Sequence, residues 1–76
     1  MKLNLGGQLS FYLPGHPRQL DVQLDGPTLL SEVLASLGIP IAEIYIVTFK
    51  GEMVDPHNTL VSQEDEVKLY PPVDGG

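Results

Sequence analysis

The sequence ends in two glycines, Gly75 and Gly76, whose residue type and position fit a chemical role. Glycine has no side chain and few backbone restrictions, so such an end can thread a narrow channel and present an unshielded terminal carboxylate. That carboxylate could be activated by attack on the α-phosphorus of ATP. Because the sequence carries no phosphate-binding or metal-binding motif for this step, we expect a partner enzyme to supply it and to use the ATP. We expect no cofactor on the chain itself.

The residues before the two glycines support the interpretation of a reactive end. Pro71 and Pro72 cannot donate backbone hydrogen bonds, so they end a strand and favour an extended exit from it. Two terminal glycines by themselves are weak evidence, since a frayed end can carry them by chance. Their position after a strand and a proline pair makes a reactive end the better interpretation.

Other residues with reactive side chains are better interpreted as exposed residues of loops and turns. His16 and His57 both neighbour prolines and lie far apart in the sequence, and Asp55 beside His57 does not complete the three or four ligands of a metal site. The acidic run Glu64-Asp65-Glu66 is typical of a solvated turn rather than of paired acid and base. The sequence has no cysteine, which excludes disulfides and thiol chemistry. We therefore expect no metal site and no catalytic activity of the chain itself.

The net charge of the chain indicates which kinds of molecule it can bind. Ten acidic residues against four basic ones give a net charge of −6, which disfavours nucleic acid and suits a basic protein partner or simply keeps the protein soluble. No leader pattern is visible, and no apolar run approaches the ~20 residues of a membrane span. We expect a cytoplasmic protein with no membrane contact.

The elements that must position the C-terminal end can be read from hydrophobic periodicity. Leu30, Val33, Leu34 and Leu37 form one helical stripe, for which Thr28 is a candidate N-cap and Gly38 a stop. Strands are predicted around Leu3 and Leu5, from Leu20 to Leu24, from Ile44 to Phe49, at Met53-Val54, and from Glu66 to Tyr70. The apolar strand 44–49 is typical of the centre of a sheet covered on both faces. One helix across one mixed sheet buries these apolar faces economically.

The segment after the first strand has two interpretations. Leu9, Phe11 and Leu13 alternate with polar residues, which locally predicts a hairpin with Gly6-Gly7 as its turn. The alternative is a turn or short helical segment over residues 8–13.

The stretch from Glu64 to Gly76 resembles the C-terminal signature of the MoaD/ThiS sulfur carriers, in which an acidic turn leads to the last strand and a proline-rich tail ending in Gly-Gly. Leu37-Gly38-Ile39-Pro40 after the helix is also similar to the family. The resemblance implies an α+β, β-grasp (ubiquitin-like) domain over residues 1–70, with a mixed four- to five-stranded sheet, one main helix and a flexible tail over residues 71–76. It also favours the long first strand followed by an irregular turn over the local hairpin.

The resemblance further implies a carrier cycle. An activating enzyme adenylates Gly76, a sulfur donor converts it to a thiocarboxylate, and the sulfur passes to a cofactor precursor, with Gly75 as the required neighbour. The ending Pro-Pro-Val-x-Gly-Gly is closest to the small subunit of molybdopterin synthase, whose large subunit would then be a further partner. Thiamine, tungsten-pterin and tRNA thiolation are alternative acceptors. A protein modifier joined to lysines through Gly76, or an interaction domain with an inert tail, are alternatives of other classes.

A docking surface for the partner enzyme is expected beside the tail. Lys68 and Tyr70 point outward from the last strand, and by analogy with the recognition face of ubiquitin Ile46 or Thr48 would neighbour them. The tail residues Pro71, Pro72 and Val73 complete the predicted surface. Scattered surface apolar residues are the alternative interpretation.

Overall fold

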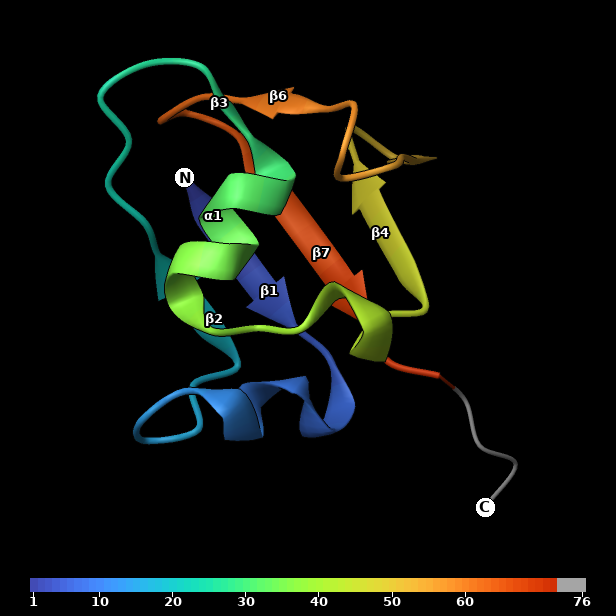
Figure 1. The fold of residues 1–76 in the computed structure, drawn as a ribbon. Coiled ribbons are helices and arrows are strands. Elements are labelled where there is room, and N and C mark those ends of the chain that lie inside the picture. The colour runs from blue at the N-terminus through green and yellow to red at the C-terminus, as the bar shows by residue number, and fades with distance from the viewer. Residues whose placement is uncertain (73–76) are drawn as a thin grey trace.

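The chain folds into two layers in a computed structural model that describes residues 1–72. One layer is a mixed five-stranded sheet in the order β2-β1-β7-β4-β5, and helix α1 lies across one of its faces (Figure 1). β1 and β7 are parallel, and the other neighbouring strands are antiparallel. The strands of this sheet are β1 (Lys2–Leu5), β2 (Gln19–Asp21), β4 (Ile46–Phe49), β5 (Glu52–Met53) and β7 (Glu66–Tyr70). The predicted β-grasp class is confirmed.

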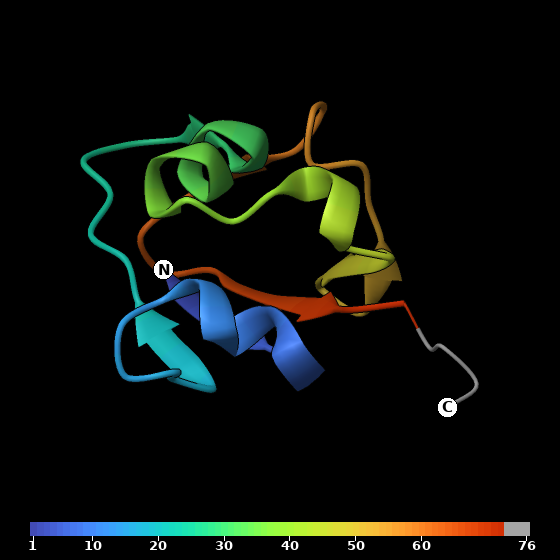
Figure 2. The ribbon, with the colours of Figure 1, turned by 60° about the horizontal axis from the view of Figure 1, so that its bottom comes forward.

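Helix α1 (Leu30–Leu37) uses the apolar stripe seen in the sequence to cover the sheet. Leu30, Val33 and Leu34 are buried, whereas Leu37 is only partly buried at the end of the stripe. Gly38 takes the left-handed conformation with φ of 78° and ends the helix as predicted, because glycine adopts this conformation without steric cost. Figure 2 shows α1 and the short 3₁₀ turn η2 (Ile41–Glu43) on the same side of β7.

The predicted N-cap of the helix is wrong. Thr28 belongs to the short strand β3 (Thr28–Leu29), and its hydroxyl donates to the carbonyl of Gly26 at 2.9 Å instead of accepting from the helix. β3 pairs with β6 (Leu60–Val61) in a separate two-stranded sheet that the sequence analysis did not predict. Strands of two residues carry too short a pattern to be recognised from alternation.

Backbone carbonyls from a distant loop satisfy the first amides of the helix in place of Thr28. The amide of Leu30 donates to the carbonyl of Thr59 at 2.9 Å, and the amide of Ser31 donates to that of Pro56 at 3.0 Å. The start of an α-helix leaves amides without intrahelical partners. Loop 55–59 therefore anchors the N-terminus of α1 to the chain that enters β6.

The segment after β1 is a 3₁₀ helix, η1 (Gly7–Tyr12), so the local hairpin interpretation is wrong and the short helical segment is right. A hairpin is excluded because β1 already pairs with β2 on one edge and β7 on the other. The alternation in the sequence does not correspond to one buried face, because Leu9 and Leu13 are buried whereas Phe11 between them is exposed. β1 itself has only four residues, so the long first strand implied by the resemblance is not formed.

β7 rather than β4 holds the centre of the sheet. β4 begins at Ile46 instead of Ile44 and has only Val47 fully buried, since the helix covers one face and leaves the other open. β7 follows the prediction in full: Val67 and Leu69 face the core, and the alternate residues are exposed. β2 ends at Asp21, earlier than the predicted strand. Within residues 1–72, no helix is long and apolar enough to cross a membrane.

Candidate functional site

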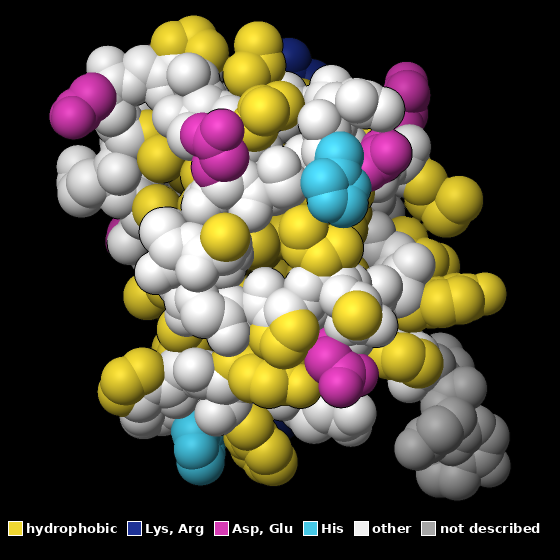
Figure 3. All heavy atoms as spheres, viewed as in Figure 1, with side chains coloured by type: hydrophobic (Ala, Val, Ile, Leu, Met, Phe, Trp, Pro, Cys, Tyr) yellow, Lys and Arg dark blue, Asp and Glu magenta, His cyan; other side chains and the backbone are white. Residues whose placement is uncertain are grey.

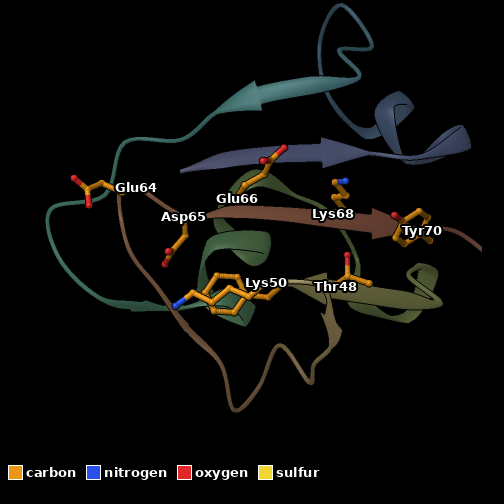
Figure 4. A pocket seen from close by; sticks show the side chains of 9 residues that line it. Thr48, Lys50, Glu64, Asp65, Glu66, Lys68 and Tyr70 are labelled. Carbon is orange, nitrogen blue, oxygen red and sulfur yellow. The ribbon is translucent and has the colours of Figure 1, made fainter.

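The open face of the sheet, on the side away from α1, carries a groove that runs along β7 (Figure 4). The side chains on this face come from the outward positions of neighbouring strands, because alternate residues of a strand point to opposite faces. Tyr70 lies at the end of the groove nearest the C-terminal segment, and Glu64 lies at the other end (Figure 4). The groove is lined by Thr48, Phe49, Lys50, Gly51, Glu64, Asp65, Glu66, Lys68 and Tyr70.

The register of β4 and β7 brings four of the predicted docking residues together. Ile46 lies opposite Tyr70, and Thr48 lies opposite Lys68. Lys68 and Tyr70 are exposed, while Ile46 and Thr48 are partly buried between their neighbours. Directly opposed side chains of an antiparallel pair are in contact range, so these residues form one continuous surface.

Met53 extends this surface and was missed by the sequence analysis. It lies opposite Thr48 in the pairing of β4 and β5, and its side chain is 72% exposed. The Lys50-Gly51 turn could have indicated this position, because a two-residue turn fixes which residue of the next strand lies opposite Thr48. Both residues have positive φ, 56° and 80°, as a tight two-residue hairpin turn requires.

Basic side chains gather on the open face. Lys2 lies beside Glu66 in the pairing of β1 with β7, and Lys50 and Lys68 line the groove, so this face carries three of the four basic residues of the sequence. The opposite, helix side shows Asp and Glu side chains and almost no Lys or Arg (Figure 3). Glu64, Asp65 and Glu66 line the same groove, so the open face carries side chains of both charges.

Two residues of the acidic run at the start of β7 make hydrogen bonds that stabilise the fold. Glu66 accepts a hydrogen bond of 2.7 Å from the side-chain amide of Asn4 on β1, whose oxygen accepts one of 3.0 Å from Gln19 on β2. Asp65 accepts from the amide of Ser62 at 2.7 Å and closes the turn into β7. These two side chains hold strands and a turn together.

The two histidines lie apart from the groove. His57 Nδ1 is 3.2 Å from Asp55 Oδ1 in an exposed loop, and the ring of His16 packs 4.7 Å from that of Phe11. The backbone amide of His57 donates to Asp55 at 2.9 Å, which lowers the pKa of that carboxyl below its ordinary value of 3.8. Among residues 1–72, no three His, Asp or Glu side chains are grouped to hold a metal ion.

The end of β7 is fixed from both sides before the chain leaves the sheet. The carbonyl of Leu69 accepts from the amide of Gly6 at 2.9 Å, and the carbonyl of Tyr70 accepts from that of Tyr45 at 2.8 Å. Pro71 is partly buried and Pro72 is exposed. The remaining predicted site residues, Val73, Gly75 and Gly76, lie outside the described residues.

Comparison with protein families gives a match over most of the chain. Residues 11–76 match the model of the ThiS family, a span that includes the helix, β7 and the C-terminal segment. A search of curated proteins finds no match.

Proposed function

The chain belongs to the ThiS family of small sulfur carriers, and from that membership we propose that the Gly76 carboxylate is the group that carries the sulfur. In this proposal the chain is a non-catalytic substrate of an activating enzyme and a sulfur donor, and it acts in the cytoplasm. Family membership supports sulfur carriage and such partners in general; the residue and the steps below are the proposal.

The proposed cycle has two steps. A carboxylate oxygen of Gly76 attacks the α-phosphorus of ATP, the bond to the β-phosphate bridge breaks, and pyrophosphate leaves. A hydrosulfide equivalent then attacks the carbonyl carbon of the acyl-adenylate, AMP leaves, and a proton is released, so that a thiocarboxylate remains. The activating enzyme supplies the metal ion and the phosphate-binding groups.

The observation that supports this proposal is the end of β7 beside the open face. The Leu69 and Tyr70 carbonyls are bonded to Gly6 and Tyr45, so the chain leaves the body at Pro71 from a fixed point. The surface of Ile46, Thr48, Lys68, Tyr70 and Met53 adjoins that point. A partner that docked on this surface would find the C-terminal segment next to it, and Gly75 and Gly76 would offer no side chain to obstruct its channel.

The proposed acceptor is a molybdopterin-type precursor. The support is the ending Pro71-Pro72-Val73-Asp74-Gly75-Gly76, which resembles that of the small subunit of molybdopterin synthase. In that case the large subunit of the synthase would bind the same end after the sulfur is loaded. An assay with the precursor and the large subunit should convert the loaded carrier back to the carboxylate, and an unconsumed thiocarboxylate would redirect the search to thiamine, tungsten-pterin or tRNA acceptors.

The test of the carrier role is intact mass spectrometry after incubation with an activating enzyme of the family, ATP, Mg²⁺ and sulfide. The expected product has one oxygen replaced by sulfur. A chain lacking Gly76 should stay unmodified and unfold at the same temperature. No adduct on the wild-type chain, with an enzyme that modifies its own carrier, would contradict the proposal. Conjugates with other proteins that survive denaturing gels would instead favour a protein modifier.

A further inference from the structure

The Gly6-Gly7 step lies directly against the end of β7, far from it in sequence but adjacent in space. Gly6 donates its amide to the Leu69 carbonyl at 2.9 Å, which brings the two backbones into contact just where the strand ends. η1 begins at Gly7 and contacts both β1 and β7. The two glycines therefore line the point at which the chain leaves the sheet.

Neither glycine could carry a side chain without moving this point. A Cβ atom on Gly6 would lie 2.9 Å from the Leu69 carbonyl oxygen and 3.3 Å from Cδ of Pro71. A Cβ atom on Gly7 would lie 2.7 Å from Cγ of Pro71, and Gly7 also has a φ of +52°. Both distances under 3.0 Å are closer than non-bonded carbon contacts allow.

The other left-handed glycines show that this close approach is specific to the step. Gly15, Gly38 and Gly51 have φ between 78° and 80°, yet a Cβ on any of them would have no heavy atom within 4 Å. At these three positions glycine is needed only for its backbone conformation. At Gly7 the conformation and the absence of a side chain are both needed.

If a side chain were placed at Gly7, Pro71 would have to yield rather than η1. η1 is held in the core by Leu9, which is fully buried, and by the hydrogen bond of the Leu9 amide to the Gly6 carbonyl at 3.1 Å. Pro71 is only partly buried and its ring has no hydrogen bond to lose. The ring can be displaced at lower cost than the buried leucine.

The position of the Pro71 ring sets the direction in which the chain departs. Tyr70 is held by its carbonyl on the Tyr45 amide. A residue before proline is restricted to extended conformations, and the proline ring fixes its own φ near −65°. The Gly6-Gly7 step lies close against the ring, so it limits how far the ring can shift relative to the docking surface at Ile46 and Tyr70.

We infer that Gly6 and Gly7 are positioning residues that orient the departure of the C-terminal segment for the activating enzyme. This inference rests on the proposed function. Pro71 is the first of the six residues that follow β7 and end at Gly76, so its position sets where this segment starts relative to the docking surface. A partner that engages both the surface and the end of the chain loses effective concentration when the two are misaligned.

The test is a set of variants of the full chain in steady-state adenylation, followed by pyrophosphate release. Gly7→Ala adds the obstructing Cβ atom and should raise KM for the carrier by about tenfold or more. Gly15→Ala is the matched control, because it carries the same left-handed backbone cost in open space and should leave KM unchanged. Circular dichroism at the assay temperature must show that both variants are fully folded.

A rescue experiment separates positioning from a structural effect. Pro71→Ala removes Cγ and Cδ of the ring, so in the Pro71→Ala background the further change Gly7→Ala should alter KM little. A loss in Gly7→Ala that equals that in Gly15→Ala, or that persists undiminished in the Pro71→Ala background, would overturn the positioning role alone. Absence of any adenylation of the wild-type chain would overturn the proposed function, and this inference with it.

Discussion

Tyr70 lies directly opposite Ile46 in the antiparallel pairing of β7 with β4, and both side chains face the open side of the sheet. Tyr70 is also the last strand residue before the chain leaves the body. Tyr70 has 42% of its surface exposed, and tyrosine is one of the residue types enriched among those that dominate binding at protein interfaces. This pair therefore carries the first prediction.

Tyr70→Glu is expected to weaken binding of the activating enzyme by about tenfold or more, since loss of an interface aromatic commonly costs over 1 kcal/mol. The fold should persist, because the side chain is exposed and the core residues Val67 and Leu69 are unchanged. Leu60→Glu is the control: it places the same charge on an exposed leucine of β6, away from the groove. Equal affinities of the two variants in calorimetry would remove Tyr70 from the docking surface.

Lys50→Asn is expected to stabilise the hairpin of β4 and β5. Lys50 has a φ of 56°, a conformation that costs most residues about 1 kcal/mol or more but suits asparagine before glycine. Lys50 Nζ also lies 5.1 Å from the centre of the Phe49 ring, an attraction that both Asn and Gln would lose. Lys50→Gln is therefore the control, and urea unfolding should show Lys50→Asn to be the more stable of the two by about 1 kcal/mol. Equal stability would contradict this account of the turn.

Asp55 should make the stability of loop 55–59 depend on acid pH. Its pKa is lowered by the hydrogen bond from the His57 amide, so the ionised carboxylate stabilises the folded state above the ordinary value of 3.8. The contribution should be lost as pH falls below 3.8 through the folded-state pKa. The difference in urea midpoint between wild type and Asp55→Asn should shrink between neutral pH and that range. A carboxyl titration by NMR with a pKa at or above 3.8 would refute the prediction.

Leu34→Ala should destabilise the domain by about 2–5 kcal/mol, because the side chain is fully buried between α1 and the sheet and its removal leaves a cavity. For a domain of 76 residues that is a large part of the total stability. Leu60→Ala, on an exposed leucine, should change the free energy of unfolding by less than about 0.5 kcal/mol. Chemical denaturation of both variants measures the contrast, and similar losses would place the core elsewhere.

Much of the fold follows from the sequence because its signals are local and repeated. The stripe of α1 and the alternation of β7 extend over enough residues to fix both the type of element and the buried face. The pairing partners of Lys68 and Tyr70 could be anticipated because the resemblance supplied the topology. The charges, the missing cysteine and the Gly75-Gly76 ending are properties of composition, and no folding is needed to see them.

The remaining features depend on contacts between residues far apart in the sequence. The alternation from Leu9 to Leu13 is compatible with a strand, but β2 and β7 occupy both edges of β1, so the segment cannot pair with β1 and is a 3₁₀ helix instead. Thr28 is of a residue type that commonly caps helices, yet the first amides of α1 donate to the carbonyls of Pro56 and Thr59 instead. Gly6-Gly7 is a turn signal by sequence, and its closeness to Pro71 exists only once β1 and β7 are parallel neighbours. Periodicity determines which face of an element is buried, whereas tertiary packing decides which distant backbone occupies each free hydrogen-bonding edge.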